Sequence, residues 1–276
     1  MTKAVQIKGR TVVFEVSNAG TIENPKLKFV AYSEDTFSDD VERLIADRIN
    51  FFLSLQDDLK EFYKIACQDD KMKPAIKQFY GHKQVKFITP FEIACWAVIN
   101  QRIQMTVARR MKERIIERIG GHLKVKEVEY EAFPEASVLA RVEPASLLEM
   151  VPYQRKAEYV LGVAKAFNNI DEGWLRSGPY DEVYQWLRSI KGIGEWSANF
   201  IMIRGLGRME KLSTIGPELA LDAGRVYAKR DEPITDEEVC EIAEKYGNWK
   251  GYWAYYLRIY AEFTYVFEKG KKQLTR

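Results

Sequence analysis

The sequence predicts an α+β fold that is mostly α-helical, with a small N-terminal sheet followed by helices. Residues 12–16 and 26–32 alternate apolar and polar side chains and are rich in β-branched and aromatic residues, which is typical of strands. Turn signals containing Gly, Asn and Pro separate them. From Ser38 onward the apolar residues recur at helical spacing. The Gly-Ile-Gly segment at 192–194 then lies between two apolar helices and predicts a hairpin.

The expected helices have recognisable starts and breaks. The first follows Ser38-Asp-Asp, and a longer helical region over 91–115 is interrupted near 100–102. Prolines mark the starts or ends of shorter helices in the middle of the chain. The first helix carries the apolar stripe Val41, Leu44, Ile45, Ile49, Phe52 and Leu53, and the prolines are Pro134, Pro144 and Pro152.

Composition excludes several protein classes. With 276 residues, of which 46% are hydrophobic and 30% charged, the chain can bury a large core and form one or two domains. No apolar run is long enough to span a bilayer, and the N-terminus lacks the apolar region of a signal peptide. We therefore expect a cytoplasmic protein without a membrane role.

The charge balance and the metal-binding residue types are uninformative about partners. The chain has 42 Lys and Arg against 40 Asp and Glu, and this net charge of +2 does not by itself indicate nucleic-acid binding. Its cysteines, Cys67, Cys95 and Cys240, are odd in number and far apart, which argues against disulfides or a zinc site. His82 and His122 have no metal-ligand spacing. We expect no divalent metal and no organic cofactor.

The Gly192-Ile193-Gly194 hairpin is typical of an anion-binding site. Glycines let the backbone come close to a ligand, and Ile193 between them can anchor the turn in the core. The N–H groups of the following helix then favour an anion such as a DNA phosphate. A short Gly-x-Gly is equally typical of a helix C-cap before a tight turn. The flanking residues therefore decide between the two.

Those flanking residues, Trp196-Ser-Ala-Asn199 and Arg204-Gly205, resemble the helix-hairpin-helix DNA glycosylases, and within them the 3-methyladenine DNA glycosylase II branch. The resemblance covers most of the chain beyond its first few dozen residues. Further segments that look like the family, in family order, are 58–63, 90–92 running into 98–101, and 249–252.

The resemblance implies three domains. A small α/β domain would occupy residues 1–63, and a helical domain with the helix-hairpin-helix would occupy 91–208. Residues 64–90 and 209–276 would form a second helical domain that carries the catalytic carboxylate. The family's iron–sulfur variant is excluded, because Cys240 is the only cysteine near the C-terminus.

The resemblance implies a monofunctional DNA glycosylase that hydrolyses the N-glycosidic bond of alkylated purines of the 3-methyladenine type in base excision repair. Such an enzyme extrudes the nucleotide and needs an aromatic pocket for the base. Trp196 and Phe200, at positions i and i+4, would share one helix face against that base. A cationic purine would gain a cation–π term there. Outside this family context, such a pair is more often part of the core.

The carboxylate departs from the family pattern. Relatives have an aspartate at the start of a later helix, and the alignment places Glu218 at this position, with Asp222 one turn later as the fallback. Gly216 as N-cap and Pro217 as first helical residue put Glu218 in the first turn, where the dipole favours an ionised carboxylate. The longer side chain moves the charge, so an alternative is a catalytically impaired protein that only binds damaged DNA.

Three further roles are carried over from the family. The wedge that fills the vacated stack would follow Gln101, at Arg102 or Ile103, and an aliphatic side chain suits unstacking better. Relatives that also cleave the strand have a lysine just after the hairpin, where this chain has Trp196, so no lyase activity is expected. A monovalent cation, Na⁺ or K⁺, would bind the backbone carbonyls of Arg188, Ile190 and Ile193.

The implied partner is double-stranded DNA containing a damaged base, bound by a monomer that is nucleoid-associated in a prokaryote. The C-terminal aromatic residues leave two interpretations open, because they are as typical of a packed helix as of a ligand cleft. These residues are Tyr252, Trp253, Tyr255 and Tyr256.

Overall fold

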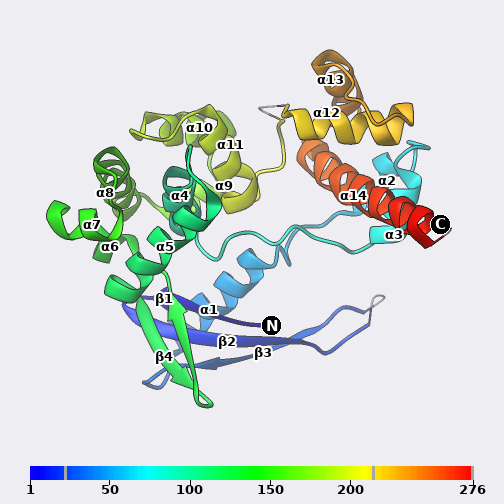
Figure 1. The fold of residues 1–276 in the computed structure, drawn as a ribbon. Helices are drawn as coiled ribbons and strands as arrows, with labels where there is room; N and C mark the ends of the chain where they lie inside the picture. The colour runs from blue at the N-terminus through cyan, green and yellow to red at the C-terminus, as the bar shows by residue number, and fades with distance from the viewer. Residues whose placement is uncertain (22–23, 213–214, 275–276) are drawn as a thin grey trace. The chain divides into compact units, whose positions relative to one another are not determined.

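The computed structural model describes residues 1–21, 24–212 and 215–274, with side chains up to Tyr265. The fold is mostly helical, as predicted, and its described residues form one three-stranded and one two-stranded antiparallel sheet (Figure 1). The chain divides into two compact units. Unit 1 is Met1–Leu55 with Val85–Leu206, and unit 2 is Gln56–Gln84 with Gly207–Arg276. No helix in the described ranges is both long and apolar enough to cross a membrane.

The N-terminal sheet of unit 1 has the order β1 (Thr2–Ile7), β2 (Arg10–Asn18) and β3 (Leu27–Tyr32). The two strands expected from the sequence are confirmed as β2 and β3, and β1 is an additional strand. One face of the sheet packs against α1 (Asp39–Phe52), which buries most of its predicted apolar stripe. The residues that form this layer are Val5, Ile7, Val12, Phe14 and Val16 of the sheet with Val41, Ile45, Ile49 and Phe52 of α1.

A second hairpin, β4 (Gly121–Val125) with β5 (Val128–Ala132), interrupts the helices. Helix dominates after the first sheet, as expected, and this hairpin is an element that the sequence did not lead us to predict. Leu123 and Val125 alternate with polar residues and pack on Val13 of β2, so the period-two signal was present. This packing places the N-terminal sheet and the neighbouring helices in one unit. The three-domain division stays a prediction.

An ion-pair network also joins the N-terminal part of unit 1 to its helices. The Arg48 guanidinium donates to both carboxylate oxygens of Glu172, at 2.8 and 3.0 Å. Arg176 pairs with Asp47 at 2.8 Å and lies 3.9 Å from the ring centroid of Phe51. Bidentate pairs of this kind fix orientation, so α1 is held against the helix that carries Glu172.

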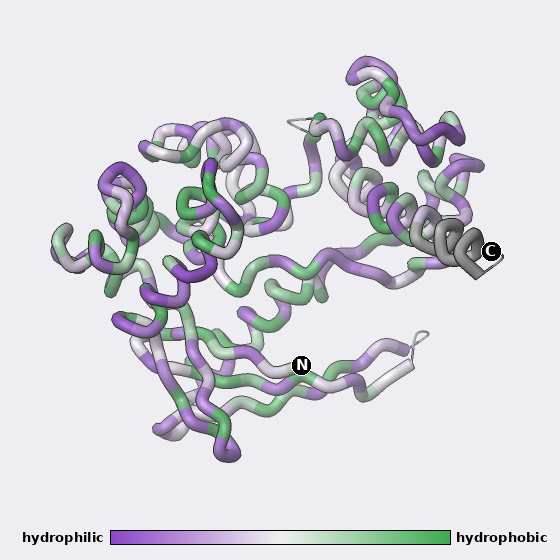
Figure 2. The backbone as a smooth tube through the Cα atoms, in the orientation of Figure 1, coloured by the Kyte–Doolittle hydropathy of each residue, from purple (hydrophilic) through white to green (hydrophobic). Residues whose placement is uncertain are grey.

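The helices of unit 1 surround α4, whose residues are almost all apolar and buried. The predicted break near residue 100 is confirmed, because α4 ends at Ile99 and the next helix starts at Met105. Green and purple alternate along the surrounding helices in Figure 2, as expected for amphipathic helices. The elements are α4 (Pro90–Ile99), α5 (Met105–Ile119), α6 (Ala136–Leu139), α7 (Pro144–Met150), α8 (Gln154–Asn168), α9 (Glu172–Ser177), α10 (Tyr180–Ser189), α11 (Glu195–Phe200) and the π-helix η1 (Ile201–Leu206).

Unit 2 is a helical cluster with an aromatic core. Its long C-terminal helix packs against the other helices of the unit, and Phe62 contacts several aromatic rings at centroid distances of 5.0–6.4 Å. The elements are α2 (Lys60–Ala66), α3 (Lys73–Phe79), α12 (Pro217–Ala223), the π-helix η2 (Gly224–Ala228), α13 (Asp236–Glu244), the 3-10 helix η3 (Gly247–Trp249) and α14 (Lys250–Leu274).

The C-terminal aromatic residues belong to this core. Tyr252, Trp253 and Tyr256 are buried. Of the two interpretations, a packed helix and a ligand cleft, their burial favours the packed helix. Tyr255 is half-buried and its ring stacks on that of His82. Buried hydroxyls need partners, and each of these tyrosines finds one in the described residues. For example, Tyr252 donates a short hydrogen bond to the Asp57 carboxylate, and Tyr256 donates to the carbonyl of His82 at 2.7 Å.

Asp69 is the acceptor for two further core tyrosines. The hydroxyls of Tyr227 and Tyr246 donate to the same carboxylate oxygen, at 2.7 and 2.9 Å. Burial raises the pKa of both hydroxyls, and the nearby Asp69 charge raises them further, so both stay protonated as donors. The neighbouring Asp70 is exposed and pairs only with surface Lys73 among the described residues, at 2.6 Å.

We predict that Asp69→Ala lowers the free energy of unfolding by about 3 kcal/mol, because the hydroxyls of buried Tyr246 and half-buried Tyr227 lose a charged acceptor. Asp70→Ala is the matched control. It should change the free energy of unfolding by less than about 0.5 kcal/mol, as expected for a surface ion pair. Urea unfolding followed by circular dichroism measures both. Equal effects of the two substitutions would contradict the assigned role of Asp69.

Candidate functional site

The hairpin between α10 and α11 has the predicted geometry. Gly192 has a φ of +98°, and Ile193 is 4% exposed and packs in the core of unit 1. The Ile193 amide donates to the Ile190 carbonyl at 3.0 Å, which closes the turn. Gly194 is then the N-cap of α11. The first-turn amides of α11 have no acceptor within the helix and are free to hold an anion.

The two hairpin glycines are present for different reasons. A Cβ on Gly192 would lie 2.5 Å from the ring of Tyr159, and φ at this residue is in the left-handed region. Gly194 has a φ of −81°, and a Cβ there would meet no atom within 4 Å. Internal packing therefore requires Gly192 but does not require Gly194. The space beside Gly194 is open to a ligand.

Trp196 and Phe200 share one face of α11, as predicted. Their rings are stacked, with centroids 5.1 Å apart and planes 12° from parallel. Trp196 is 57% exposed, so it is not part of the core, whereas Phe200 is half-buried and contacts Phe87 edge-on. The stack leaves indole surface available to a planar ligand, and Phe200 supports it from the protein side.

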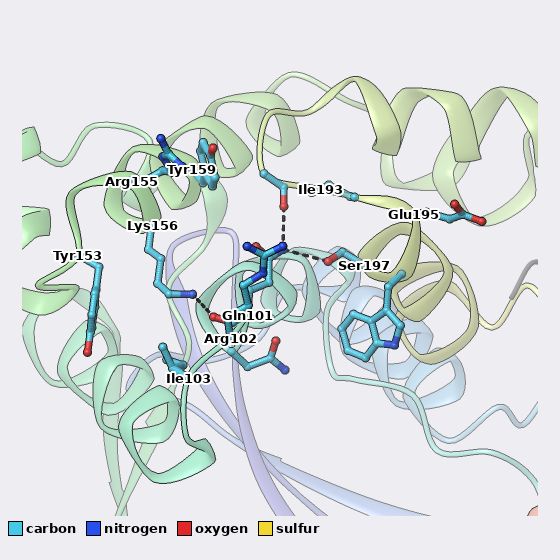
Figure 3. Close-up of a pocket in the computed structure, with 14 residues that line it drawn as sticks. Gln101, Arg102, Ile103, Tyr153, Arg155, Lys156, Tyr159, Ile193, Glu195 and Ser197 are labelled. Atoms are coloured by element: carbon cyan, nitrogen blue, oxygen red, sulfur yellow. Dashed lines mark hydrogen bonds between the residues drawn. The ribbon is translucent and has the colours of Figure 1, made fainter. Parts of the chain in front are cut away.

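An open groove of about 1030 Å³ runs along the hairpin (Figure 3). It combines cationic and aromatic side chains, which suit a polyanion with planar bases. Its lining includes the loop between α4 and α5, the start of α8 and the start of α11. The lining residues with charged or aromatic side chains are Arg102, Tyr153, Arg155, Lys156, Tyr159, Glu195 and Trp196.

The predicted wedge candidates lie on the loop between α4 and α5, on the groove wall. Arg102 is exposed and has a φ of +51°, a conformation that is uncommon for any residue other than glycine. Ile103 is half-buried and packs against the core of unit 1. The structure brings both to the groove that also contains the hairpin and Trp196. Of the two, Arg102 is the more accessible.

The candidate carboxylates lie on α12 of unit 2, which begins at Pro217 after the Gly216 N-cap, as predicted. The Glu218 side chain is 76% exposed and pairs with Arg258 at 3.1 Å. Asp222 is buried and lies 3.6 Å from Arg225. Burial raises the pKa of the Asp222 carboxyl, and Arg225 and Arg258 partly oppose this shift. The two carboxylates therefore differ in exposure.

No group of three or more His, Cys, Asp and Glu side chains in the described part of the chain is placed to hold a metal ion. Cys67 and Cys240 are exposed, and Cys95 is buried in the core. The carbonyls expected to hold a monovalent cation lie at the end of α10 and in the hairpin. The Ile190 carbonyl already accepts the Ile193 amide, but a carbonyl oxygen has a second lone pair, so the donor set still suits such an ion.

Some residues of the site were missed by the sequence analysis. Tyr159 lies under the hairpin, Lys156 contacts the loop between α4 and α5, and Arg258 pairs with Glu218. Each contacts a residue at least 33 positions away in the sequence, as the pair Tyr159 and Gly192 shows. No local pattern signals such contacts, and only the fold brings these residues together.

Comparisons with known proteins show the family of this chain. The family model for the HhH-GPD superfamily base excision DNA repair protein matches residues 95–262. A DNA-3-methyladenine glycosylase of Bacillus subtilis is 27% identical over 215 residues, which cover 77% of this chain and 71% of that protein. The chain therefore belongs to the HhH-GPD superfamily of base excision DNA repair proteins.

Solved structures share the fold. The 3-methyladenine DNA glycosylase from Archaeoglobus fulgidus has a TM-score of 0.75 at 24% identity, covering 95% of this chain and 87% of that chain. A Clostridium acetobutylicum 8-oxoguanine glycosylase/lyase in complex with double-stranded DNA has a TM-score of 0.65 at 19% identity, covering 95% of this chain and 88% of that one. At these identities the likeness shows the fold alone.

The two hairpin glycines provide a matched test of anion binding. We predict that Gly194→Ala leaves the unfolding midpoint nearly unchanged, because nothing in the protein meets the new Cβ, and weakens DNA binding about tenfold or more by keeping a phosphate away from the backbone. Gly192→Ala should destabilise the fold, because of its clash with Tyr159 and its positive φ. Fluorescence anisotropy with duplex DNA and thermal unfolding give the two readouts. Unchanged DNA binding by Gly194→Ala would contradict the assignment.

The buried Asp222 carboxyl gives a pH prediction. Its pKa is raised in the folded state above the ordinary value of 3.8, so its ionisation destabilises the fold. This destabilisation is absent below pH 3.8 and develops as the pH rises through the folded-state pKa. Asp222→Asn should therefore raise the unfolding midpoint at neutral pH, and the gain should disappear on acidification below that pH. A variant less stable than the wild type at pH 7 would contradict the direction of the shift.

Proposed function

We propose that the protein is a monofunctional DNA glycosylase that hydrolyses the N-glycosidic bond of alkylated purines of the 3-methyladenine type in double-stranded DNA. The observation that carries the proposal is the exposed indole of Trp196, stacked on Phe200 at the first turn after an anion-binding hairpin. The name of the Bacillus subtilis relative supports this substrate class. The protein would act as a monomer.

Base recognition would use the free face of Trp196. An extruded purine stacks on this indole, and the positive charge of an alkylated purine adds a cation–π attraction that an undamaged base lacks. The amides of the first turn of α11 would hold a phosphate of the same DNA, and a monovalent cation on nearby carbonyls would fix the turn. Arg102 or Ile103 would fill the vacated stack.

Bond cleavage would use a carboxylate of α12. As the base leaves, positive charge develops on the sugar, and an ionised carboxylate stabilises it and orients the attacking water. Glu218 is our first choice, because its exposed side chain in the first turn of α12 is accessible to a substrate. For Glu218 to reach the sugar, its ion pair with Arg258 must break, or both side chains must move together. Asp222 is the alternative, and burial raises the pKa of its carboxyl.

Hydrolysis without strand cleavage is supported by the residues around the hairpin. A lyase needs an amine that attacks the sugar carbon. The position just after the hairpin is the non-nucleophilic Trp196, and Lys191 precedes the hairpin, with its ammonium 5.9 Å from the ring centroid of Tyr159. Neither is suited to form a Schiff base with the substrate.

We predict that Glu218→Gln lowers base release from methylated duplex DNA by about a hundredfold or more, because the neutral amide no longer stabilises the cationic sugar. DNA affinity should change little. Asp222→Asn should retain most of the activity. Glu237→Gln, an exposed change in the first turn of α13, is the matched control. Chromatography of the released bases gives the rates at equal protein concentration.

The outcomes separate the alternatives. Loss of release only in Asp222→Asn would transfer the catalytic role to Asp222. Full activity of both variants would overturn the carboxylate assignment. A wild-type protein that binds damaged DNA and releases no base would overturn the glycosylase proposal and leave a lesion-binding protein of the same fold.

A further inference from the structure

The loop between α4 and α5 is held in an unfavourable conformation by contacts on both sides. Arg102, in the middle of this loop, has a φ of +51°. A left-handed conformation is unfavourable for a non-glycine residue and persists only when its surroundings impose it. The residue just before it, Gln101, makes the contacts that impose it.

The side chain of Gln101 reaches the hairpin. Its Nε2 donates to the carbonyl oxygen of Gly192 at 2.8 Å and to the Ser197 hydroxyl at 3.1 Å (Figure 3). Both amide hydrogens are thereby used. One goes to the turn itself and the other to the first helical turn of α11, next to Trp196. The orientation of the Gln101 amide depends on the hairpin geometry, because the carbonyl that accepts from it belongs to Gly192. The positive φ at this position requires glycine.

The backbone of Gln101 is held from the opposite side by Lys156. The Lys156 ammonium donates to the carbonyl of Gln101 at 2.6 Å and to that of Val98 at 3.2 Å, at the C-terminal end of α4. A cation is favourable there, since the helix dipole is negative at its C-terminus. Lys156 itself lies in the first turn of α8, where a cation is unfavourable for the helix. Its contact with the loop accounts for its position.

We propose that Gln101 and Lys156 are positioning residues that join the hairpin and the loop at 100–104 into one rigid surface. When the hairpin binds a phosphate, the attached loop is then also fixed relative to the DNA, and this determines where Arg102 and Ile103 contact the stacked bases. This inference rests on the proposed function, in which the hairpin holds DNA and the loop supports base extrusion. Neither residue touches the reacting atoms.

The arrangement has a measurable consequence for base extrusion. Moving a nucleotide out of a duplex costs most when its base is well paired and least when it is mismatched. A preorganised loop lowers that cost, because its own ordering is completed before DNA binds. Loss of the two contacts should therefore slow the release of a paired lesion more than the release of the same lesion in a mismatch.

The test compares two pairs of matched variants on two substrates. Gln101→Met keeps the side-chain length without the donors, and Gln68→Met is the exposed control. Lys156→Met is matched by Lys165→Met, an exposed position on the same helix. The substrates are one duplex in which a methylated purine is correctly paired and one in which it is mismatched. Single-turnover base release is measured for each.

We expect Gln101→Met and Lys156→Met to lose about tenfold more rate on the paired than on the mismatched lesion, as two lost hydrogen bonds allow. The control variants should show no such difference. Equal losses on the two substrates would overturn the proposal, because a general loss of folded protein slows both alike. Lys156→Arg, which keeps a cationic donor, should recover most of the difference.

A second readout keeps the proposal testable if base release fails. In a duplex with 2-aminopurine beside an abasic analogue, insertion of the loop should raise the fluorescence with wild-type protein. Gln101→Met should show a smaller rise at saturating protein, with an unchanged salt dependence of binding. An equal rise in both proteins would overturn the positioning role. Binding with no base release from either lesion would overturn the proposed function alone.

Discussion

The close approach of Gly192 to the ring of Tyr159 is the contact on which the rest of the binding surface depends. Only a residue without Cβ fits there, and its positive φ turns the chain so that Ile193 enters the core. The turn then presents the Gly192 carbonyl to Gln101 and starts α11, whose first-turn amides have no acceptor within the helix. The exposed Trp196 follows two residues after the turn. One backbone conformation therefore determines the proposed phosphate site, the contact with Gln101 and the position of the Trp196 indole.

The residues that we propose for recognition and those that we propose for chemistry belong to different units. Unit 1 holds the hairpin, the loop and the aromatic stack, and unit 2 holds the carboxylates of α12. In unit 2, tyrosine hydroxyls of the core donate to carboxylates such as Asp57 and Asp69, and a polar network whose members are all satisfied favours one packing of the core. A core of this kind holds α12 and α14 together, and with them the Glu218–Arg258 pair. Loss of that order would displace the carboxylates as well as destabilise the fold.

Local signals account for what the sequence predicted. The glycine hairpin, the break near residue 100, the shared face of Trp196 and Phe200, and the start of α12 at Pro217 all follow from turn chemistry or helical period. The β4–β5 hairpin was missed although Leu123 and Val125 show the alternation. The roles of Lys156 and Arg258 had no such signal, because their partners are distant in sequence. Trp196 differs from an ordinary core residue in its exposure, and this exposure can be known only from the folded structure.

The central claim is that water, and not a protein amine, displaces the damaged base. The most direct test is incubation of the wild-type protein with methylated duplex DNA in the presence of borohydride, which reduces a Schiff base to a permanent cross-link. If water displaces the base, we expect release of free methylated purine, no covalent protein–DNA adduct and a strand that stays intact until alkali is added. An adduct, or a strand cut without alkali, would contradict it.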